Sequence, residues 1–320
     1  MSAHVVVTDY TFPDVAMERR AATESGASFV DFQCRNAADV TASVAGAKVV
    51  AVQFAQVTAE AISNLADAAT IIRYGIGYDN IDLEAAKASG VRVGYVPDYC
   101  TDEVAEHSSA AALTLLRKLT ALDASVRAGA WKSAETAKPM KPLAEVRFGF
   151  FGFGQIGRAV HARLKGFGFA FQAADPALTP EAAADLGIEL VGPDKLLAEC
   201  DVVSLHAPST PSTHHFVNAE RLASMKSHAV LVNCARGSLV DENALAAALT
   251  SHSLGGAALD VFNTEPLPAT SPLRDAPNLL LSPHAAWYSD AAIERLQRYV
   301  AEDIRRALDG RAPRRPVPDT

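Results

Sequence analysis

The sequence is poor in cysteine, carries no excess of positive charge and has no long apolar run. Its four cysteines among 320 residues are scattered and never form a Cys-x-x-Cys pair, so we expect neither a disulfide framework nor a zinc site. The formal net charge of −8 gives no basic surface for nucleic acid or anionic lipid. No run approaches the roughly 20 apolar residues of a membrane span, and the N-terminus lacks a signal-peptide pattern. We therefore expect a cytoplasmic protein with no metal, nucleic-acid or membrane partner.

The apolar residues that are present form short runs, which alternate with stretches of helical composition. The first set of strand-like runs is residues 5–7, 49–52, 71–72 and 91–93. The second set is residues 148–151, 169–173, 202–205, 230–232, 257–259 and 279–281. Such alternation is typical of parallel sheets covered by helices. The sequence therefore predicts an α/β fold with two Rossmann-like domains, each a doubly wound parallel sheet.

Two stretches with helical periodicity mark the boundary between these domains. One begins near Thr101, a plausible N-cap. The other covers residues 290–308 and ends before Gly310, a common helix stop. Residues 134–142, with two prolines, predict a surface loop. The expected domains are residues 1–100 plus 289–320, and residues 101–288.

A glycine pattern, Gly152-Phe153-Gly154-Gln155-Ile156-Gly157, directly follows one of the strand-like runs. In such a pattern the first glycine allows a tight turn and the second lets the backbone approach a pyrophosphate. The third lets the following helix pack close to the strand. The N–H groups at the start of that helix then point at the phosphates. Because a strand precedes the pattern, we interpret residues 101–288 as a dinucleotide-binding domain.

The acidic residue Asp175 ends the next apolar run, 23 residues after Gly152, near the usual offset of about 20. A carboxylate at this place can accept hydrogen bonds from a ribose diol, and it would repel a 2′-phosphate. Residues 176–179 offer no Arg or Lys to bind such a phosphate. The sequence therefore favours NAD (NADH) over NADP as the cofactor.

Three further strands end in segments that carry Arg236, Glu265 and His284. The carboxyl ends of parallel strands converge on one crevice, so these side chains would meet the nicotinamide. The set suits hydride transfer between a 2-hydroxy acid and its keto acid. A histidine can take the alcohol proton, a carboxylate can fix its tautomer, and an arginine can hold the substrate carboxylate. A plainer interpretation stays open, in which the histidine caps a loop, Arg-Gly forms a turn and Glu-Pro starts a helix.

Several separate motifs of the chain match those of one protein family, and they occur in the same order along the sequence. They are Arg73-Tyr74-Gly75-Ile76-Gly77-Tyr78-Asp79-Asn80-Ile81-Asp82, the glycine pattern with Asp175, and residues 233–241, 259–266 and 283–284. Over nearly its whole length the chain resembles the D-isomer-specific 2-hydroxyacid dehydrogenase family. Residues 97–104 and 284–289 resemble the branch that contains the C-terminal-binding-protein-like dehydrogenases. One departure is Leu143-Ala144-Glu145, where the family usually has Leu-x-Gly.

The resemblance implies a role for three groups of residues. In catalysis, Arg236 would bind and polarise the substrate, and Glu265 would support His284 as the acid/base. The substrate would also meet Arg73, the N–H groups of Ile76 and Gly77, and Trp287, although Arg73 also fits a surface ion pair and Trp287 a packing residue. Cys234 is not expected to be a nucleophile. The cofactor-binding residues would be Gly152, Gly154, Gln155, Ile156, Gly157, Asp175, His206, Pro208, Cys234, Ala235, Arg236, Asp260 and His284.

The leading hypothesis is an NAD-dependent oxidoreductase that interconverts a D-2-hydroxy acid and its 2-keto acid, with its active site in a cleft between the domains. The resemblance also implies a homodimer through the cofactor domain. The alternative is an NAD(H)-sensing binding module of the C-terminal-binding-protein type with little or no turnover. No motif encodes the substrate, although the absence of a basic cluster disfavours phosphorylated ones. Candidates to line its pocket are Gln53, Phe54, Tyr74, Tyr99 and Trp287.

Overall fold

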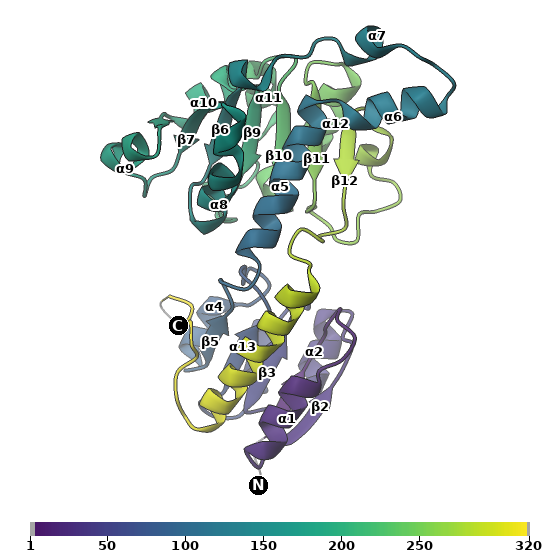
Figure 1. Ribbon diagram of the computed structural model, residues 1–320. Helices are drawn as coiled ribbons and strands as arrows, with labels where there is room; N and C mark the ends of the chain where they lie inside the picture. The colour runs from purple at the N-terminus through teal and green to yellow at the C-terminus, as the bar shows by residue number, and fades with distance from the viewer. Residues whose placement is uncertain (1–3, 319–320) are drawn as a thin grey trace. The chain divides into compact units, whose positions relative to one another are not determined.

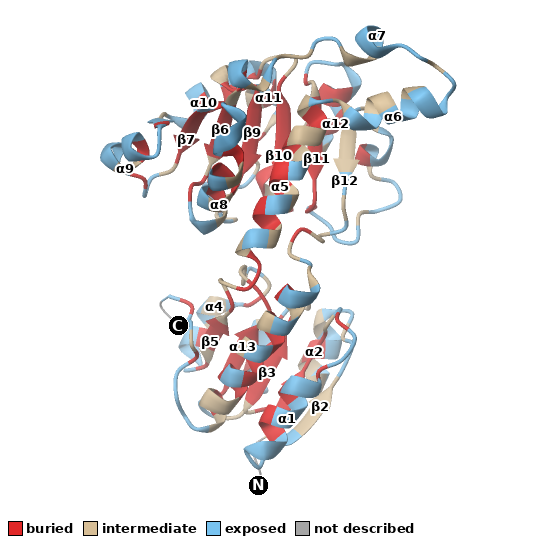
Figure 2. Ribbon diagram, in the orientation of Figure 1, coloured by how far each residue is buried: buried red, intermediate tan, exposed pale blue. Residues whose placement is uncertain are grey.

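The computed structural model describes residues 4–318 and divides into two compact units. The terminal unit consists of the residues up to Cys100 together with those from Tyr288 onward, and the central unit is Thr101–Trp287. Each unit contains one parallel sheet with helices packed on it (Figure 1). Figure 2 shows that the inner strands are the most deeply buried parts of each unit, while the outer helix faces are exposed.

The terminal unit has a five-stranded sheet in the order β2-β1-β3-β4-β5, with every neighbouring pair parallel. Strand β2 was not among the expected runs, because it is a half-exposed edge strand with polar residues at both ends. Helix α13 has the expected bounds, since the Ser289 side chain caps its start and Gly310 follows its end with a φ of +75°. The elements are β1 (His4–Val7), α1 (Ala16–Glu24), β2 (Ser28–Asp31), α2 (Ala37–Ser43), β3 (Val49–Val52), α3 (Ala59–Ser63), β4 (Thr70–Arg73), α4 (Leu83–Ala88), β5 (Arg92–Tyr95) and α13 (Asp290–Leu308).

The central unit has a seven-stranded parallel sheet in the order β12-β11-β10-β9-β6-β7-β8. The three-residue edge strand β8 was not expected, and the segment predicted as a loop contains the short helix α7. The elements are α5 (Thr101–Leu116), α6 (Leu119–Arg127), α7 (Ser133–Ala137), β6 (Arg147–Phe151), α8 (Gln155–Leu164), β7 (Ala170–Ala174), α9 (Pro180–Asp185), β8 (Ile188–Leu190), α10 (Pro193–Glu199), β9 (Val202–Leu205), α11 (Ala219–Ser224), β10 (Val230–Asn233), α12 (Glu242–Thr250), β11 (Gly256–Leu259) and β12 (Leu279–Leu281), with short 3-10 turns at Leu143–Glu145, Lys165–Phe167, Gly237–Leu239 and Pro272–Asp275.

Successive residues of each central strand point to opposite faces of the sheet. Both faces are buried, because helices pack on each of them. In β10, for example, Leu231 belongs to the core on the side of α10, α11 and α12, whereas Val230 and Val232 belong to the core on the side of α5 and α8. Two apolar layers therefore hold this sheet between helices, as expected for strands that are near-continuous apolar runs.

The strand order of each sheet reverses at one point. In the central unit the reversal lies between β6 and β9, and in the terminal unit it lies between β1 and β3. Ligands of open α/β sheets bind outside the carboxyl ends of the strands at such a point. The topology therefore favours a ligand site at the residues that follow β6 and β9.

Candidate functional site

The glycine pattern lies at the reversal point of the central sheet, where its first and third glycines are required by the fold. Gly152 has a φ of +88°, and a Cβ there would lie 2.7 Å from the backbone nitrogen of Ala207 and from the carbonyl carbon of His206. A Cβ at Gly157 would lie 2.9 Å from the carbonyl oxygen of Gly152. These two glycines let the turn after β6 pack against the segment after β9 and against α8.

The second glycine has no such requirement within the protein. Gly154 is the N-cap of α8 with a φ of −74°, and a Cβ there would meet no protein atom within 4 Å. No side chain caps the helix at this position. The start of α8 is therefore open to the close approach of a ligand. A pyrophosphate fits, since the helix that starts at Gln155 and Ile156 presents backbone N–H groups and its positive dipole end.

Asp175 follows β7 and holds the glycine turn from the side. One carboxylate oxygen accepts the N–H of Phe153 at 2.6 Å, and the other accepts the N–H of Ala177 at 2.7 Å. A carboxylate has about four acceptor sites, so these two bonds leave capacity for a ribose diol. Asp175 can therefore both fix the turn and contact a nucleotide.

Further predicted cofactor residues follow β9 and β10 at the same edge of the sheet, and Asp260 and His284 follow β11 and β12. Burial lowers the pKa of His206 to about 4, so its ring is neutral at neutral pH, and its Nε2 lies 2.9 Å from the Ser204 hydroxyl. Burial raises the pKa of Cys234 to about 12, so the thiol stays protonated and is a poor nucleophile. Pro208 and Ala235 lie beside these residues in the two loops.

His284 and Glu265 form a pair at the ends of β12 and β11. The Nδ1 atom of His284 lies 2.7 Å from one carboxylate oxygen of Glu265, and the other oxygen accepts the N–H of Phe262 at 2.9 Å. Burial acts to raise the pKa of Glu265. The hydrogen bond and the charge of His284 act to lower it and outweigh burial, so the net shift of the pKa is downward. Glu265 is therefore held as a carboxylate against the ring that it orients.

The loop that carries Arg236 packs against the loop after β11 because of the glycine that follows Arg236. A Cβ at Gly237 would collide with the backbone of residues 262–263, so only glycine lets the loop after β10 pack against the loop after β11. The Asn233 side chain donates to the carbonyl of Arg236 at 2.8 Å and fixes the turn. The charge of Arg236 contributes to the lowered pKa of Glu265. The structure thus brings the three predicted catalytic residues together within the central unit.

Asp260 and Trp287 belong to the same loop system. The carboxylate of Asp260 accepts the N–H groups of Ala285 and Ala286 at 2.9 and 2.8 Å. The indole N–H of Trp287 donates to the carbonyl of His284 at 2.7 Å. Both side chains therefore hold the backbone around His284.

The predicted substrate-carboxylate residues Arg73, Ile76 and Gly77 lie in the terminal unit, at the carboxyl end of β4. Gly75 has a φ of +134°, and a Cβ there would collide with the Arg73 guanidinium. The guanidinium donates to the carbonyl of Tyr74 at 2.8 Å. An arginine thus lies along a glycine-rich turn, which is an arrangement that can receive a carboxylate.

Two residues proposed to line a substrate pocket are engaged in the protein interior instead. Tyr74 is fully buried, and its hydroxyl donates to Glu18 of α1 at 3.1 Å. Gln53 is also buried, and its side-chain oxygen accepts the N–H of Thr11 at 2.8 Å. The prediction for Tyr74 is wrong, because its ring points under α1 and not toward the strand ends.

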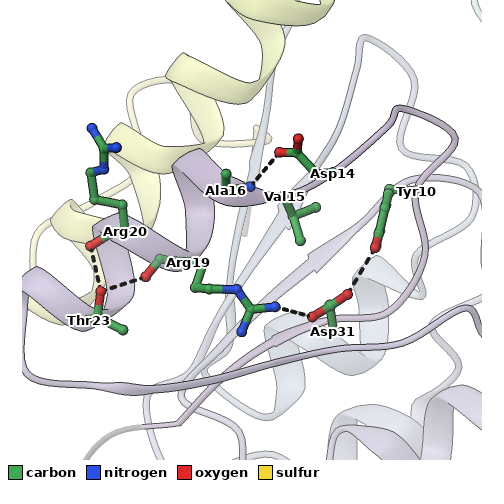
Figure 3. A pocket seen from close by; sticks show the side chains of 8 residues that line it. All are labelled: Tyr10, Asp14, Val15, Ala16, Arg19, Arg20, Thr23 and Asp31. Atoms are coloured by element: carbon green, nitrogen blue, oxygen red, sulfur yellow. Dashed lines mark hydrogen bonds and ion pairs between the residues drawn. The ribbon is translucent and has the colours of Figure 1, made fainter.

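The terminal unit also has a surface cavity of about 430 Å³ beside α1 (Figure 3). Figure 3 shows Arg19 paired with Asp31, at 2.6 Å, and the Tyr10 hydroxyl donating to the same carboxylate at 2.9 Å. The side chains of Arg19, Asp31 and Tyr10 thus bond one another, and the cavity contains none of the predicted site residues.

A second cavity, of about 450 Å³, lies at the amino ends of the central strands and includes the buried Asp201. This carboxylate accepts from Lys141, Lys226 and His228 at 2.9, 3.1 and 2.7 Å, and from the N–H of Arg147 at 2.8 Å. Burial acts to raise its pKa, but these donors hold it well below the ordinary range. The cluster holds the strand starts together and lies at the opposite edge from the glycine pattern.

Sequence reasoning missed two polar residues near His284. Ser282 donates to Asp260, and the Nε2 atom of His107 lies 3.1 Å from the Ser282 hydroxyl oxygen. A signal for His107 existed, since it stands among apolar positions of α5 at helical spacing. Its partner could not be read from the sequence, because 175 residues separate it from Ser282.

Neither a membrane-spanning helix nor a metal-binding cluster occurs in the part of the chain that the structure describes. Among residues 4–318, no helix is long and apolar enough to cross a membrane. Within the same residues, no group of three or more His, Cys, Asp or Glu side chains is placed to hold a metal ion.

Known structures resemble this one over nearly their whole length. The protein TT0316 from Thermus thermophilus superposes with a TM-score of 0.86 at 34% identity, covering 98% of this chain and 99% of that one. The D-lactate dehydrogenase of Aquifex aeolicus, solved in complex with NAD and lactic acid, superposes with a TM-score of 0.87 at 29% identity, covering 96% of each chain.

Sequence comparison agrees with the fold. The chain is 39% identical over 254 residues to proteins named D-3-phosphoglycerate dehydrogenase from Mycobacterium bovis and Mycobacterium tuberculosis. The match covers 79% of this chain and 48% of each relative, so the chain spans about half the length of these curated relatives. A family model described as "D-isomer specific 2-hydroxyacid dehydrogenase, NAD binding domain" matches residues 109–286. The cofactor is therefore NAD(H), and the chain belongs to the D-isomer-specific 2-hydroxyacid dehydrogenase family.

Proposed function

We propose that this protein is an NAD-dependent oxidoreductase that interconverts a D-2-hydroxy acid and its 2-keto acid, and that it acts as a 2-keto acid reductase. The observation that carries the proposal is the 2.7 Å pairing of His284 with Glu265, beside Arg236. All three lie at the edge of the sheet that bears the glycine pattern.

The chemistry of these residues fits the reaction. Bound NADH would supply a hydride to the carbonyl carbon of the keto acid. Because Nδ1 of His284 is bonded to Glu265, the proton for the carbonyl oxygen would come from Nε2. Glu265 would stabilise the imidazolium before that transfer, and Arg236 would bind the substrate carboxylate and polarise the carbonyl. In the reverse direction His284 would accept the proton of the alcohol.

The terminal unit would supply the other contacts to the substrate carboxylate, through Arg73 and the N–H groups of Ile76 and Gly77. The support for this role is the position of the Arg73 guanidinium along the turn at Gly75. Exchange of Arg73 for Ala should raise the KM for the keto acid by about tenfold, the scale of one charge-assisted bond, and leave NADH affinity unchanged.

The rest of the substrate would be uncharged, in contrast to the phosphorylated compound in the name of the mycobacterial relatives. In the described residues, the segments that follow β1, β3, β4 and β5 contain no Lys or Arg. Arg35 follows the edge strand β2 and is exposed. A phosphate ester is normally bound by several cationic or N–H donors. We therefore propose an unphosphorylated keto acid.

The test is oxidation of NADH against 2-keto acids from glyoxylate to phenylpyruvate, with NADPH in parallel and D-3-phosphoglycerate plus NAD in the reverse direction. We expect NADH-dependent turnover of an unphosphorylated keto acid and none with D-3-phosphoglycerate. His284→Ala should lose turnover by at least about 100-fold while still binding NADH. Tight NADH binding without turnover of any substrate would instead favour the NAD(H)-sensing module.

We further propose a homodimer formed through the central unit. Helix α6 has no buried residue, and it exposes 54% of Leu119 and 53% of Val126. Trp131, just beyond the helix, is 91% exposed. Apolar side chains gathered in this way are typical of an interaction surface. Light scattering should give twice the chain mass, and Trp131→Ala should weaken that association.

A further inference from the structure

The loop that carries His284 has an unusual backbone. His284 has a φ of +53°, a left-handed conformation that is uncommon for residues other than glycine. Such a conformation lowers the equilibrium constant for folding on the order of tenfold. Such a conformation persists only where the surroundings hold it. The position of the His284 ring therefore depends on the contacts that hold the backbone of its loop.

Asp260 fixes it. Its carbonyl accepts the N–H of His284 at 2.7 Å, and its carboxylate accepts the N–H groups of Ala285 and Ala286. Asp260 is only 1% exposed. One buried residue thus holds three successive N–H groups, beginning at His284 itself.

Asp260 is held in turn by Ser282 and His107. The Ser282 hydroxyl donates to a carboxylate oxygen of Asp260 at 2.5 Å. Because a hydroxyl has one proton, Ser282 must accept at its oxygen from His107, whose Nε2 lies 3.1 Å away. Nε2 of His107 is also 4.0 Å from the same carboxylate oxygen. A chain of donors therefore runs from α5 through Ser282 to Asp260.

We infer that Ser282 and His107 are positioning residues for the acid/base histidine, acting through Asp260; the inference rests on the proposed function of His284. The His107 ring orients the Ser282 hydroxyl, and the hydroxyl binds the carboxylate that holds residues 284–286. Without the hydroxyl, one oxygen of Asp260 keeps only the N–H of Ala285, and the loop relaxes from its left-handed conformation. A shift of about 1 Å at a reacting group can cost about 100-fold in rate, so partial relaxation should be visible in kcat.

The experiment compares wild-type protein with Ser282→Ala, Ser282→Thr and His107→Gln. The readouts are kcat with the best keto acid, the KM for that acid and the Kd for NADH. Ser282→Ala should lower kcat about tenfold and leave the NADH Kd within about twofold. The reason is that the substitution displaces the His284 ring, which acts in the proton transfer and not in the binding of NADH. Ser282→Thr keeps the hydroxyl and should restore most of kcat. His107→Gln should lower kcat about threefold, since a side-chain amide can still donate to the serine.

The double variant and a matched control sharpen the test. If the two residues act in one chain, Ser282→Ala combined with His107→Gln should be no slower than Ser282→Ala alone. Ser253→Ala removes a hydroxyl near the opposite end of β11, where it bonds only a local carbonyl and a neighbouring serine, and should leave kcat unchanged. His107 is partly exposed and its variant should fold even if Ser282→Ala does not.

The outcomes separate the inference from the proposed function. Wild-type turnover with an unchanged kcat in Ser282→Ala and His107→Gln would overturn the inference and leave the function standing. An equal loss in Ser282→Ala and Ser282→Thr would also overturn it, because packing and not the hydroxyl would then matter. Absence of turnover in the wild-type protein would overturn both.

Discussion

The two sheets of this molecule share a parallel, doubly wound plan but differ in what occupies the point where the strand order reverses. In the central unit that point has the glycine turn and the start of α8, with open space at Gly154. In the terminal unit it has the carboxylate of Asp9, which accepts the N–H groups of Gln53, Phe54 and Ala55 at 3.1, 2.6 and 3.1 Å.

This difference explains why one of two similar sheets is suited to a nucleotide. Backbone N–H groups bind phosphate when they point into a ligand site. At the reversal point of the terminal unit, a carboxylate of the protein already takes those donors and adds a negative charge. The same topology therefore serves as a nucleotide site in one unit and as a fixed loop in the other, and fold alone does not assign function.

The largest expected effect tests the open space at Gly154. Gly154→Val should weaken NADH binding by about 1000-fold, or about 4 kcal/mol, because the new side chain would occupy the place of the pyrophosphate. The matched control is Gly192→Val. Gly192 is also an N-cap glycine with an extended backbone, no side-chain cap bond and no atom within 4 Å of a Cβ. Calorimetric titration with NADH should separate the two variants, and equal affinities would remove the argument for a ligand at Gly154.

The next effect tests the closed point in the terminal unit. Asp9→Asn should lower the free energy of unfolding by about 3 kcal/mol, because the amide N–H groups would face backbone N–H groups in a buried place. NADH affinity should not change. Asp67→Asn makes the same chemical change on an exposed side chain and should be near neutral. A loss of NADH binding in Asp9→Asn without a loss of stability would contradict the comparison.

A smaller effect concerns pH and a second buried carboxyl of the terminal unit. Burial raises the pKa of Glu18 from 4.5 to about 7, and its side-chain hydrogen-bond partners, Tyr74 and Gln297, carry no positive charge. The folded protein holds this proton more tightly than the unfolded chain, so the contribution to stability falls as pH rises from about 4.5 to about 7. Glu18→Gln should therefore stabilise the protein by about 2 kcal/mol at pH 8 and have little effect at pH 4.5.

Thermal unfolding at several pH values measures this. Glu60→Gln, at an exposed position in the first turn of α3, is the control and should leave the pH dependence unchanged. A Glu18→Gln variant that loses stability at pH 8 would show that the ionised carboxylate is the favoured form in the folded protein.

The fold was largely predictable where local signals agree. Helix α13 has its predicted bounds because a capping serine, an amphipathic pattern and a terminal glycine all mark them. The edge strands β2 and β8 were missed because short, half-exposed strands have no strong apolar pattern. In the site, Arg236, Glu265 and His284 could be predicted to meet because parallel strands end at one edge. The link from His107 to Ser282 could not, since pairing between distant residues depends on packing and has no spacing in the sequence.

The smallest expected effect is at Asp175, the residue of the central unit that most resembles Asp9 of the terminal unit. Like Asp9, this carboxylate accepts backbone N–H groups, at Phe153 and Ala177. If it also binds the ribose, Asp175→Ser should weaken NADH binding about tenfold and narrow the preference for NADH over NADPH, because a repulsive charge is lost. Asp185→Ser, an equal change of charge at the end of α9, should do neither. Reduced stability with unchanged affinity for both cofactors would mean that Asp175 only holds its turn, as Asp9 does, and that nucleotide selectivity in this unit arises elsewhere.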